Sequence, residues 1–309
     1  MNCQLSDLKK IAVKFAVLAL ILFILDYALG KSLKHYYFKN TSGLFYRTTF
    51  VIDSTNAETL VFGSSRANHH YVPDIFENEL STTFYDCGRD GVGLIFQTAL
   101  IKAVTNRYKP KRILLDILPG EFSFDETDKL SPLLPYKNNP AIYPVILENS
   151  SFEPVKLLSQ IYPYNSMLST IIIGNLEINR NRREDVKGFV RLDGTMENIK
   201  PAKTNDENGK IILKKTRIFE DLLTYLNKMG IICYVIISPD YAIFNQNPTE
   251  RLAEEYCSKN KNVHFIDFTN RKDYLENYTL FHDSYHLNYK GALEFSKELC
   301  GDIKTLENN

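Results

Sequence analysis

Two short segments near opposite ends of the chain carry the residue types of a serine nucleophile and its base. Gly63-Ser64-Ser65-Arg66 follows an apolar run, and Asp283 precedes His286 by three residues. A serine on the turn from a strand to a helix is exposed and lies near the positive end of the helix dipole. An aspartate three residues before a histidine can accept the Nδ1 proton and direct Nε2 at a hydroxyl. Each segment alone is also common as an ordinary turn, but together they favour acyl transfer through serine.

A third segment, Asp86-Cys87-Gly88-Arg89-Asp90-Gly91, lies between these two in the sequence. Its glycines allow a backbone N–H to approach a developing oxyanion. The first and third of these segments, at 63–66 and 86–91, follow predicted strands directly. The segment that carries Asp283 and His286 is expected to lie beside the same strand ends. We therefore expect them to meet at one edge of a sheet.

The elements that would position these residues alternate along the chain. Continuous apolar runs predict buried strands, and the segments between them carry apolar residues at helical spacing. The predicted strands are ETLVF, TTFYDC, RILLDIL, IICYVIIS and VHFIDF. Helices are expected at about 68–80, over 92–108, up to Gly230, and from a cap at Asn247-Pro248-Thr249-Glu250. This alternation predicts an α/β fold with a parallel sheet covered on both faces.

Three segments, VFGSSRANHH, YDCGRDGVG and HDSYHLNYKGA, resemble the SGNH (GDSL-like) hydrolase superfamily. The resemblance is to membrane-anchored members found among bacterial cell-envelope and surface-polysaccharide genes. It spans about Glu58 to Leu299, apart from an insertion. It implies a flavodoxin-like three-layer α/β/α sandwich with a parallel sheet and a Ser-His-Asp site for esters.

Carried over residue by residue, the resemblance assigns Ser65 as the nucleophile, His286 as the base and Asp283 as its partner. It also implies an oxyanion hole formed by the backbone N–H groups of Ser65 and Gly91. No cofactor is implied. Arg66 would either bind an anionic group of the substrate or pair with a neighbouring carboxylate, because arginine suits both roles.

Two positions depart from the family pattern. Leu118-Pro119-Gly120-Glu121 stands where the family has a G-x-N-D string, whose Asn donates to the oxyanion, and Asp86 replaces the Asn that opens the second block. Losing one oxyanion donor commonly lowers the rate by about 10²–10³. A donor from the insertion or from Arg66 could replace it.

Other polar residues near these motifs have two readings each. His69 and His70 follow the nucleophile by four and five residues, and we expect a solvated helical turn there rather than a place in the cleft. Asp116 and Glu121 lie at the carboxyl end of a predicted strand. Either a cleft position or a salt bridge explains them.

The N-terminal segment 11–29 is almost wholly apolar and about as long as a bilayer core requires. A membrane anchor is favoured over a cleaved signal peptide and over a buried globular helix. The domain prediction is an anchor over 1–30, a polar tether over 31–56 and an α/β domain over 57–309. An insertion at about 123–207 is expected over the strand ends, with Tyr136, Tyr143, Tyr162 and Tyr164 as candidate sugar-stacking surfaces.

Composition excludes several other classes of protein. The 37 Lys and Arg balance the 37 Asp and Glu, so the basic excess that nucleic-acid binding needs is missing. The five cysteines are scattered singly, which argues against a metal site and a complete disulfide framework. A chain of 309 residues forms one large domain or two small ones.

The sequence thus predicts a single-pass membrane protein with its catalytic domain outside the cytoplasm. The predicted activity is that of a serine esterase, a deacetylase or an O-acyltransferase on cell-envelope or surface glycan. Its predicted partners are an acylated glycan or other acyl ester and the membrane, with no nucleic acid and no metal. The alternative is a catalytically weak domain of the same fold that serves as a binding or assembly partner in glycan export.

Overall fold

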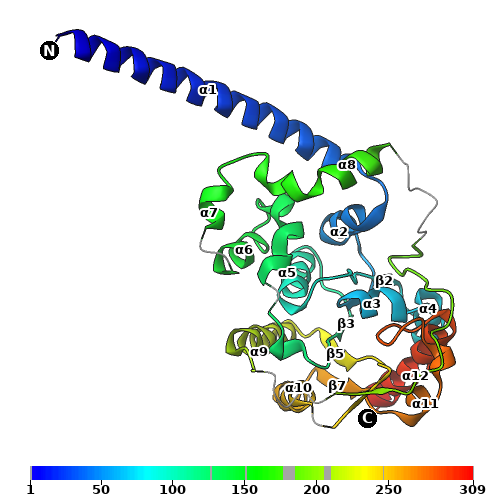
Figure 1. Cartoon of the computed structure of the whole chain (residues 1–309). Coiled ribbons are helices and arrows are strands. Elements are labelled where there is room, and N and C mark those ends of the chain that lie inside the picture. Colours follow the sequence, from blue (N-terminus) through cyan, green and yellow to red (C-terminus); the bar gives the residue numbers. More distant parts are fainter. Residues whose placement is uncertain are drawn as a thin grey trace.

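The computed structural model describes residues 2–125, 127–149, 152–176, 185–204, 210–245 and 247–308. At its centre is a five-stranded sheet with every neighbouring pair parallel (Figure 1). The strands lie in the order β2 (Phe84–Asp86), β1 (Thr59–Phe62), β3 (Arg112–Asp116), β5 (Ile232–Ile237) and β7 (Val263–Asp267). This is the strand order of flavodoxin-like folds. The predicted α/β fold with a parallel sheet is confirmed.

The strands are buried on both faces of the sheet. In β1, Leu60 and Phe62 belong to one core cluster and Val61 to the other, and in β3 Leu114 faces opposite to its two neighbours. Successive side chains of a strand point to opposite faces. Strands covered on both faces therefore read as the continuous apolar runs found in the sequence.

Helices cover each face and complete three layers (Figure 1). On one face α5 packs against α9, and α9 packs against α10; on the other, α4 packs against α12. The bounds are α5 (Leu94–Thr105), α9 (Leu213–Lys228), α10 (Pro248–Ser258), α4 (Pro73–Leu80) and α12 (Tyr289–Asn308). Shorter helices are η1 (Glu121–Ser123), α11 (Lys272–Leu275) and η5 (Tyr278–Leu280).

Local sequence signals account for several helix ends. The Asn247 side chain accepts hydrogen bonds from the N–H groups of Thr249 and Glu250, as its predicted cap role requires. The single helix expected at about 68–80 is wrong, because the structure has two helices, α3 (Ser65–His70) and α4. Pro73 explains the break: the residue before a proline is driven out of the helical region, and Val72 has a ψ of 112°.

The segment 31–56 differs from the predicted polar tether. Helix α1 (Asn2–Lys39) includes the first part of this segment. Helix α2 (Gly43–Asp53) follows and packs against α5. Tyr37, Val51 and Ile52 are buried in the core. The segment therefore packs against the domain through a few apolar side chains, although its composition is mostly polar.

The expected insertion serves two places in the fold. Most of its first part packs against α1 and α5, although Phe124 and Lys129 at its start border the pocket at the strand ends. Its last part forms a strand pair, β4 (Ala202–Thr204) with β6 (Ala242–Phe244). The first part comprises η2 (Thr127–Tyr136), α6 (Tyr143–Asn149), α7 (Glu153–Lys156), η3 (Tyr162–Met167) and α8 (Leu168–Asn175). The polar run at 179–188 lies largely outside the described residues.

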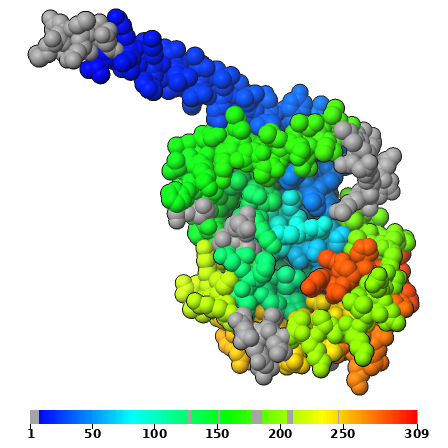
Figure 2. All heavy atoms as spheres, in the orientation of Figure 1, coloured from blue at the N-terminus to red at the C-terminus, as the bar shows by residue number. Residues whose placement is uncertain are grey.

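Helix α1 is long and apolar enough to cross a membrane. It projects from the rest of the molecule, and none of its most apolar stretch is buried (Figures 1 and 2). The structure therefore has one long apolar N-terminal helix, as the sequence predicts. The side chains of its most apolar stretch are exposed, whereas Tyr37 near its end is buried in the core.

Candidate active site

The carboxyl ends of the parallel strands meet at one edge of the sheet, and the three sequence motifs gather there. β1 ends at Phe62, and the turn Gly63-Ser64 leads directly into α3, whose first residue is Ser65. A Cβ on Gly63 would lie 2.8 Å from the backbone oxygen of Asp116 at the end of β3. Only glycine lets the two strand ends approach this closely.

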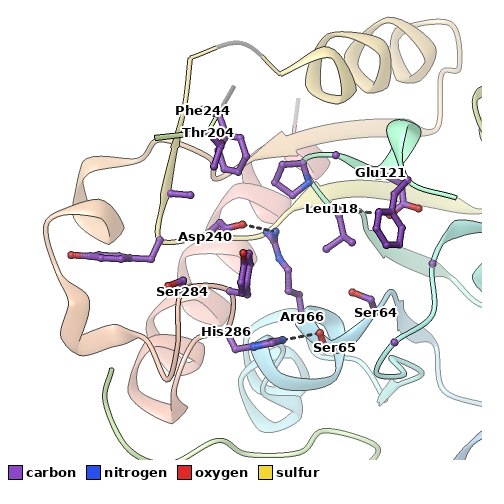
Figure 3. Close-up of a pocket in the computed structure, with 18 of the residues that line it drawn as sticks. Ser64, Ser65, Arg66, Leu118, Glu121, Thr204, Asp240, Phe244, Ser284 and His286 are labelled. Carbon is purple, nitrogen blue, oxygen red and sulfur yellow. Dashed lines mark hydrogen bonds and ion pairs between the residues drawn. The ribbon is translucent and has the colours of Figure 1, made fainter. Parts of the chain in front are cut away.

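Ser65, His286 and Asp283 form a hydrogen-bonded series. The Ser65 Oγ lies 2.7 Å from His286 Nε2 (Figure 3). On the other side of the ring, His286 Nδ1 lies 2.9 Å from both carboxylate oxygens of Asp283. A carboxylate only accepts, so Nδ1 carries the proton and Nε2 accepts from the serine hydroxyl. The three residues carried over from the resemblance are thus in the geometry of a nucleophile, a base and its orienting group.

The charge on Asp283 is held by local hydrogen bonds. One carboxylate oxygen also accepts from the backbone N–H groups of Tyr285 (2.8 Å) and His286 (2.9 Å). Burial raises the pKa of Asp283, but the hydrogen bonds from His286 and Tyr285 outweigh it and leave that pKa below its ordinary value. Asp283 is therefore ionised at neutral pH and can stabilise an imidazolium.

The two residues expected to supply backbone donors, Ser65 and Gly91, line the same pocket. Ser65 is the first residue of α3, where an N–H has no partner within the helix. Gly91 lines the pocket with a φ of 74°, and a Cβ there would meet nothing within 4 Å. Both residues line the pocket, and their role as oxyanion donors stays a prediction.

Glu121, which stands where the family pattern has a donor, is held in an ion pair. Its carboxylate accepts from Lys215 Nζ at 2.6 Å, with both side chains buried, and from the N–H groups of Leu94 and Leu118. Glu121 also borders the pocket. An acceptor so engaged cannot donate to an oxyanion, so the departure seen in the sequence is not repaired at this position.

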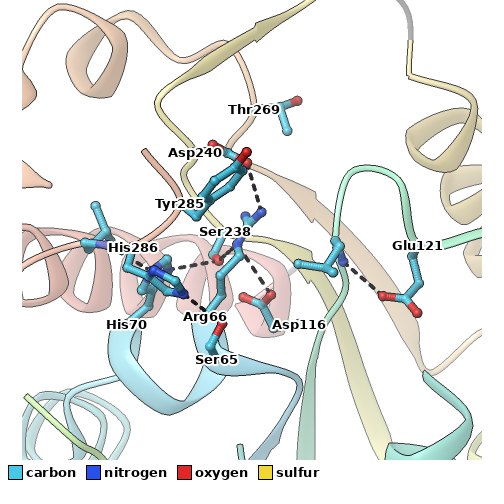
Figure 4. Close-up of polar contacts among 12 residues, drawn as sticks. Ser65, Arg66, His70, Asp116, Glu121, Ser238, Asp240, Thr269, Tyr285 and His286 are labelled. Carbon is cyan, nitrogen blue, oxygen red and sulfur yellow. Dashed lines mark hydrogen bonds and ion pairs between the residues drawn. The ribbon is translucent and has the colours of Figure 1, made fainter. Parts of the chain in front are cut away.

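Arg66 is buried beneath the pocket and bonds to the ends of two strands (Figure 4). Its Nε donates to Ser238 Oγ at 3.0 Å and lies 4.0 Å from Asp116, and its Nη1 lies 3.5 Å from Asp240. Burial raises the pKa of both Asp116 and Asp240, and the charge of Arg66 opposes that rise. The sequence allows Arg66 either to bind an anionic group of the substrate or to pair with a carboxylate. The structure shows the pairing with carboxylates.

His69 and His70 are buried, so the expectation of a solvated helical turn is wrong. His70 Nε2 accepts from the Leu287 N–H at 3.0 Å, which leaves the proton on Nδ1 to bond Ser238 Oγ at 3.0 Å. Burial lowers the pKa of His70 well below its ordinary value, with the charge of Arg66 adding to the effect. His69 Nδ1 lies 2.6 Å from the Val190 oxygen. The turn is covered because α3 packs against α12.

The pocket above these residues has a volume of about 630 Å³ (Figure 3). It is lined by the turn after β1, by the loops after β2, β3 and β5, by the strand pair β4–β6 and by the loop that carries His286. Lys129 of η2 also lines it. The predicted sugar-stacking residues Tyr136, Tyr143, Tyr162 and Tyr164 do not line it. Those tyrosines lie in the part of the insertion that packs on α1 and α5, whereas Tyr241, Tyr285, Phe124 and Phe244 provide the aromatic surface. Among the described residues, no group of three His, Cys, Asp or Glu side chains is arranged to hold a metal.

Sequence reasoning missed Ser238 and Asp240. They follow β5, whose apolar run IICYVIIS was recognised, so the strand-end rule that found the other motifs could have found them. Ser238-Pro239-Asp240 instead has the composition of an ordinary turn. Their role becomes visible only when β5 is placed next to β3.

No protein-family model matches the sequence, and no curated protein matches it. Among solved structures, the chain is similar to one described as "a putative platelet activating factor from Streptococcus pneumonia". The two are 12% identical with a TM-score of 0.42, and the match covers 92% of this chain and 99% of that chain. The interpretation of the site therefore rests on its own geometry.

Asp86 braces the loop that carries Gly91. Its Oδ1 accepts from the Gly88 N–H at 2.7 Å, and its Oδ2 is buried without a hydrogen-bond partner among the described residues. Burial raises the pKa of Asp86 well above its ordinary value, and the Gly88 hydrogen bond only partly opposes this. Because the folded pKa is raised, the carboxyl contributes full stability below about pH 4, and that contribution is lost as pH rises through the folded pKa.

We predict that Asp86→Asn raises the melting temperature at pH 8 and changes it little at pH 4. The amide keeps the acceptor for Gly88 and removes the need to take up a proton on folding, which costs stability at high pH. Thermal unfolding of the full chain in detergent at both pH values measures this. A variant less stable than the wild type at pH 8 would contradict it.

Proposed function

We propose that this protein is an SGNH-type serine acyl-ester enzyme, an esterase, deacetylase or O-acyltransferase that acts on cell-envelope or surface glycan. The observation that carries the proposal is the 2.7 Å contact from Ser65 Oγ to His286 Nε2, with Asp283 on the opposite ring nitrogen. The resemblance of the three sequence motifs to that superfamily supports the same reading.

The chemistry follows from the positions of the three side chains. Ser65 Oγ attacks the ester carbonyl while His286 Nε2 takes its proton, and Asp283 stabilises the imidazolium. The N–H groups of Ser65 and Gly91 bind the oxyanion of the tetrahedral intermediate. His286 then protonates the departing alcohol, which leaves an acyl-Ser65. Water or a sugar hydroxyl, deprotonated by the same histidine, releases the acyl group.

Arg66 and Asp240 support a polyhydroxy substrate. Both line the pocket, and the Arg66 Nη2 and Asp240 Oδ1 are buried without hydrogen-bond partners among the described residues. Arg66 extends toward Asp240 (Figure 3). These two atoms leave one donor and one acceptor unused beneath the pocket, and a sugar hydroxyl would reach them only after the two side chains shift. Tyr241 and Tyr285, which also line the pocket, offer aromatic surface to a sugar ring.

The second candidate function is a catalytically weak domain that serves as a binding or assembly partner in glycan export. The observation that favours it is Leu118-Pro119-Gly120-Glu121, where the ion-paired Glu121 supplies no oxyanion donor. The Ser65–His286–Asp283 arrangement favours the enzyme, because a scaffold has no physical need for it.

We predict that Ser65→Ala abolishes labelling by a fluorophosphonate probe and lowers ester turnover by about 10⁴-fold or more, because the nucleophile is lost. Ser64→Ala is the matched control: it alters the neighbouring serine, whose side chain is not bonded to His286, and should keep both activities. Peptide mapping locates the label. Loss of labelling in Ser64→Ala with retention in Ser65→Ala would overturn the assignment, and a wild type that neither labels nor turns over would favour the assembly role.

We predict that the acyl group moves to glycan rather than only to water. The purified chain is given an aryl acetate with and without oligosaccharide acceptors, and the products are weighed by mass spectrometry. Acetylated oligosaccharide is expected, because the pocket holds polar groups suited to an acceptor hydroxyl. Acetate release that no acceptor alters would leave hydrolysis as the reaction.

We further propose that α1 anchors the protein as a single-pass span in the cytoplasmic membrane, with the catalytic domain outside the cytoplasm. The fully exposed apolar stretch of α1 supports this. In a bacterial host, an alkaline phosphatase fused after Asn309 should be active. Fluorescence from a reporter that matures only in the cytoplasm, fused at the same place, would contradict the topology.

A further inference from the structure

The insertion is joined to α1 within the apolar stretch itself. The Asp26 carboxylate of α1 accepts hydrogen bonds from Ser159 Oγ (2.5 Å) and from the N–H groups of Gln160 (2.7 Å) and Ile161 (3.3 Å). One turn further on, a Cβ on Gly30 would lie 2.3 Å from Gln160. These contacts fix the loop at a defined position along the helix.

The segment leading into this loop exposes large apolar side chains. Phe152 is 73% exposed, Val155 68% and Leu158 77%, and Leu158 directly precedes the residues bonded to Asp26. Helix α8, which also packs on α1, exposes Leu168 and Ile172, and Leu176 directly after the helix continues the same four-residue spacing. Figure 2 shows this green part of the chain against the base of α1. Clustered apolar exposure of this kind marks an interaction surface.

A basic groove lies beside the same contacts. It has a volume of about 680 Å³, runs between α1 and the insertion, and includes Lys31, Lys34, Lys39 and Lys137. None of its lining residues is acidic. The nearby carboxylate of Asp26 is not among the lining residues, but its charge acts on Lys137. Burial lowers the pKa of Lys137, and the charge of Asp26 partly opposes this. The groove is therefore predominantly positive.

The position of the groove along α1 matches a membrane surface. The apolar stretch 11–29 has 19 residues by its numbering, and at about 1.5 Å per residue it spans about 28 Å, close to the hydrocarbon thickness of a bilayer. Lys31 and Lys34 then lie at the level of the phosphate groups. Tyr27, which also lines the groove, is of the residue type that gathers at this interface.

We propose that this surface docks on an anionic lipid bilayer. Phe152, Val155 and Leu158 enter the interface, and the groove of Lys31, Lys34, Lys39 and Lys137 holds a lipid phosphate. The proposal rests on the proposed membrane anchorage by α1 and goes beyond it: an anchor alone leaves the domain free to swing, whereas a docked surface fixes its orientation. Apolar insertion and attraction to anionic headgroups are the two terms that bind interfacial surfaces.

The apolar part is tested by the environment of a label in the full chain, held in nanodiscs with anionic lipid. In a Cys3→Ser background the four remaining cysteines are buried, so an environment-sensitive fluorophore attaches only to an added cysteine. At Leu158→Cys we expect spin-labelled lipid to quench the label at least about twofold. The control is Ile199→Cys, an apolar side chain 49% exposed whose backbone oxygen is bonded to Tyr241, in the half of the molecule away from α1, and its label should not be quenched.

The basic part is tested by charge. A basic residue near an anionic surface changes binding by about fivefold, so Lys34→Glu should lower the ratio of docked to undocked chain by at least that factor. Replacing anionic with zwitterionic lipid should have a similar effect. Lys228→Glu, at an exposed lysine of α9, is the matched control and should change nothing.

Each outcome has a separate meaning. A label at 158 that is as free of quenching as the label at 199, in chain that remains in the nanodisc, overturns the docking surface and leaves the anchor standing. Quenching that is unaffected by lipid charge and by Lys34→Glu overturns the phosphate site. Chain that carbonate extracts from cell membranes overturns the anchor and the docking surface together.

Discussion

A single buried guanidinium connects the parts of the candidate site. Arg66 follows Ser65 on α3 and reaches the ends of β3 and β5 through Asp116, Ser238 and Asp240. The energetic constraint is strict, because a buried charge is costly unless carboxylates and hydrogen-bond acceptors surround it. The turn after β1 therefore cannot shift without separating these charges, and the position of Ser65 at the pocket depends on that network.

The relay itself combines one local contact with one long-range contact. Asp283 and His286 are three residues apart, and their side chains and backbone form a closed turn that needs little else. Ser65 is 221 residues from His286 and meets it only because α3 packs against α12. His70 strengthens this junction: it links the Leu287 N–H to Ser238 and so ties the histidine loop to the end of β5.

The segment between β3 and α9 contributes residues to two distant sites, the candidate pocket and the groove beside α1. Most of its first part packs against the base of α1 and exposes apolar and basic side chains there. Phe124 and Lys129 at its start and Ala202 and Thr204 at its end border the pocket. One stretch of chain thus contributes to both the candidate pocket and the proposed membrane-facing surface. Because both are joined to the same rigid sheet, an orientation imposed at α1 would be transmitted to the pocket.

The sequence by itself determined the elements and the local chemistry. Apolar runs placed five strands, Asn247 placed a helix start, and the motifs named Ser65, Asp283, His286 and Gly91, because periodicity, capping and short-range geometry are properties of neighbouring residues. Only the tertiary structure decided which strand ends lie next to each other, and with them the contacts of Ser238 and Asp240. It also decided that His69 and His70 are buried and that the four candidate tyrosines of the insertion lie outside the pocket. Segment 31–56, which the sequence predicts to be a polar tether, is mostly helical and packs against the domain. Burial and electrostatic pairing depend on residues far apart in the chain, and no pattern within one segment records its partner.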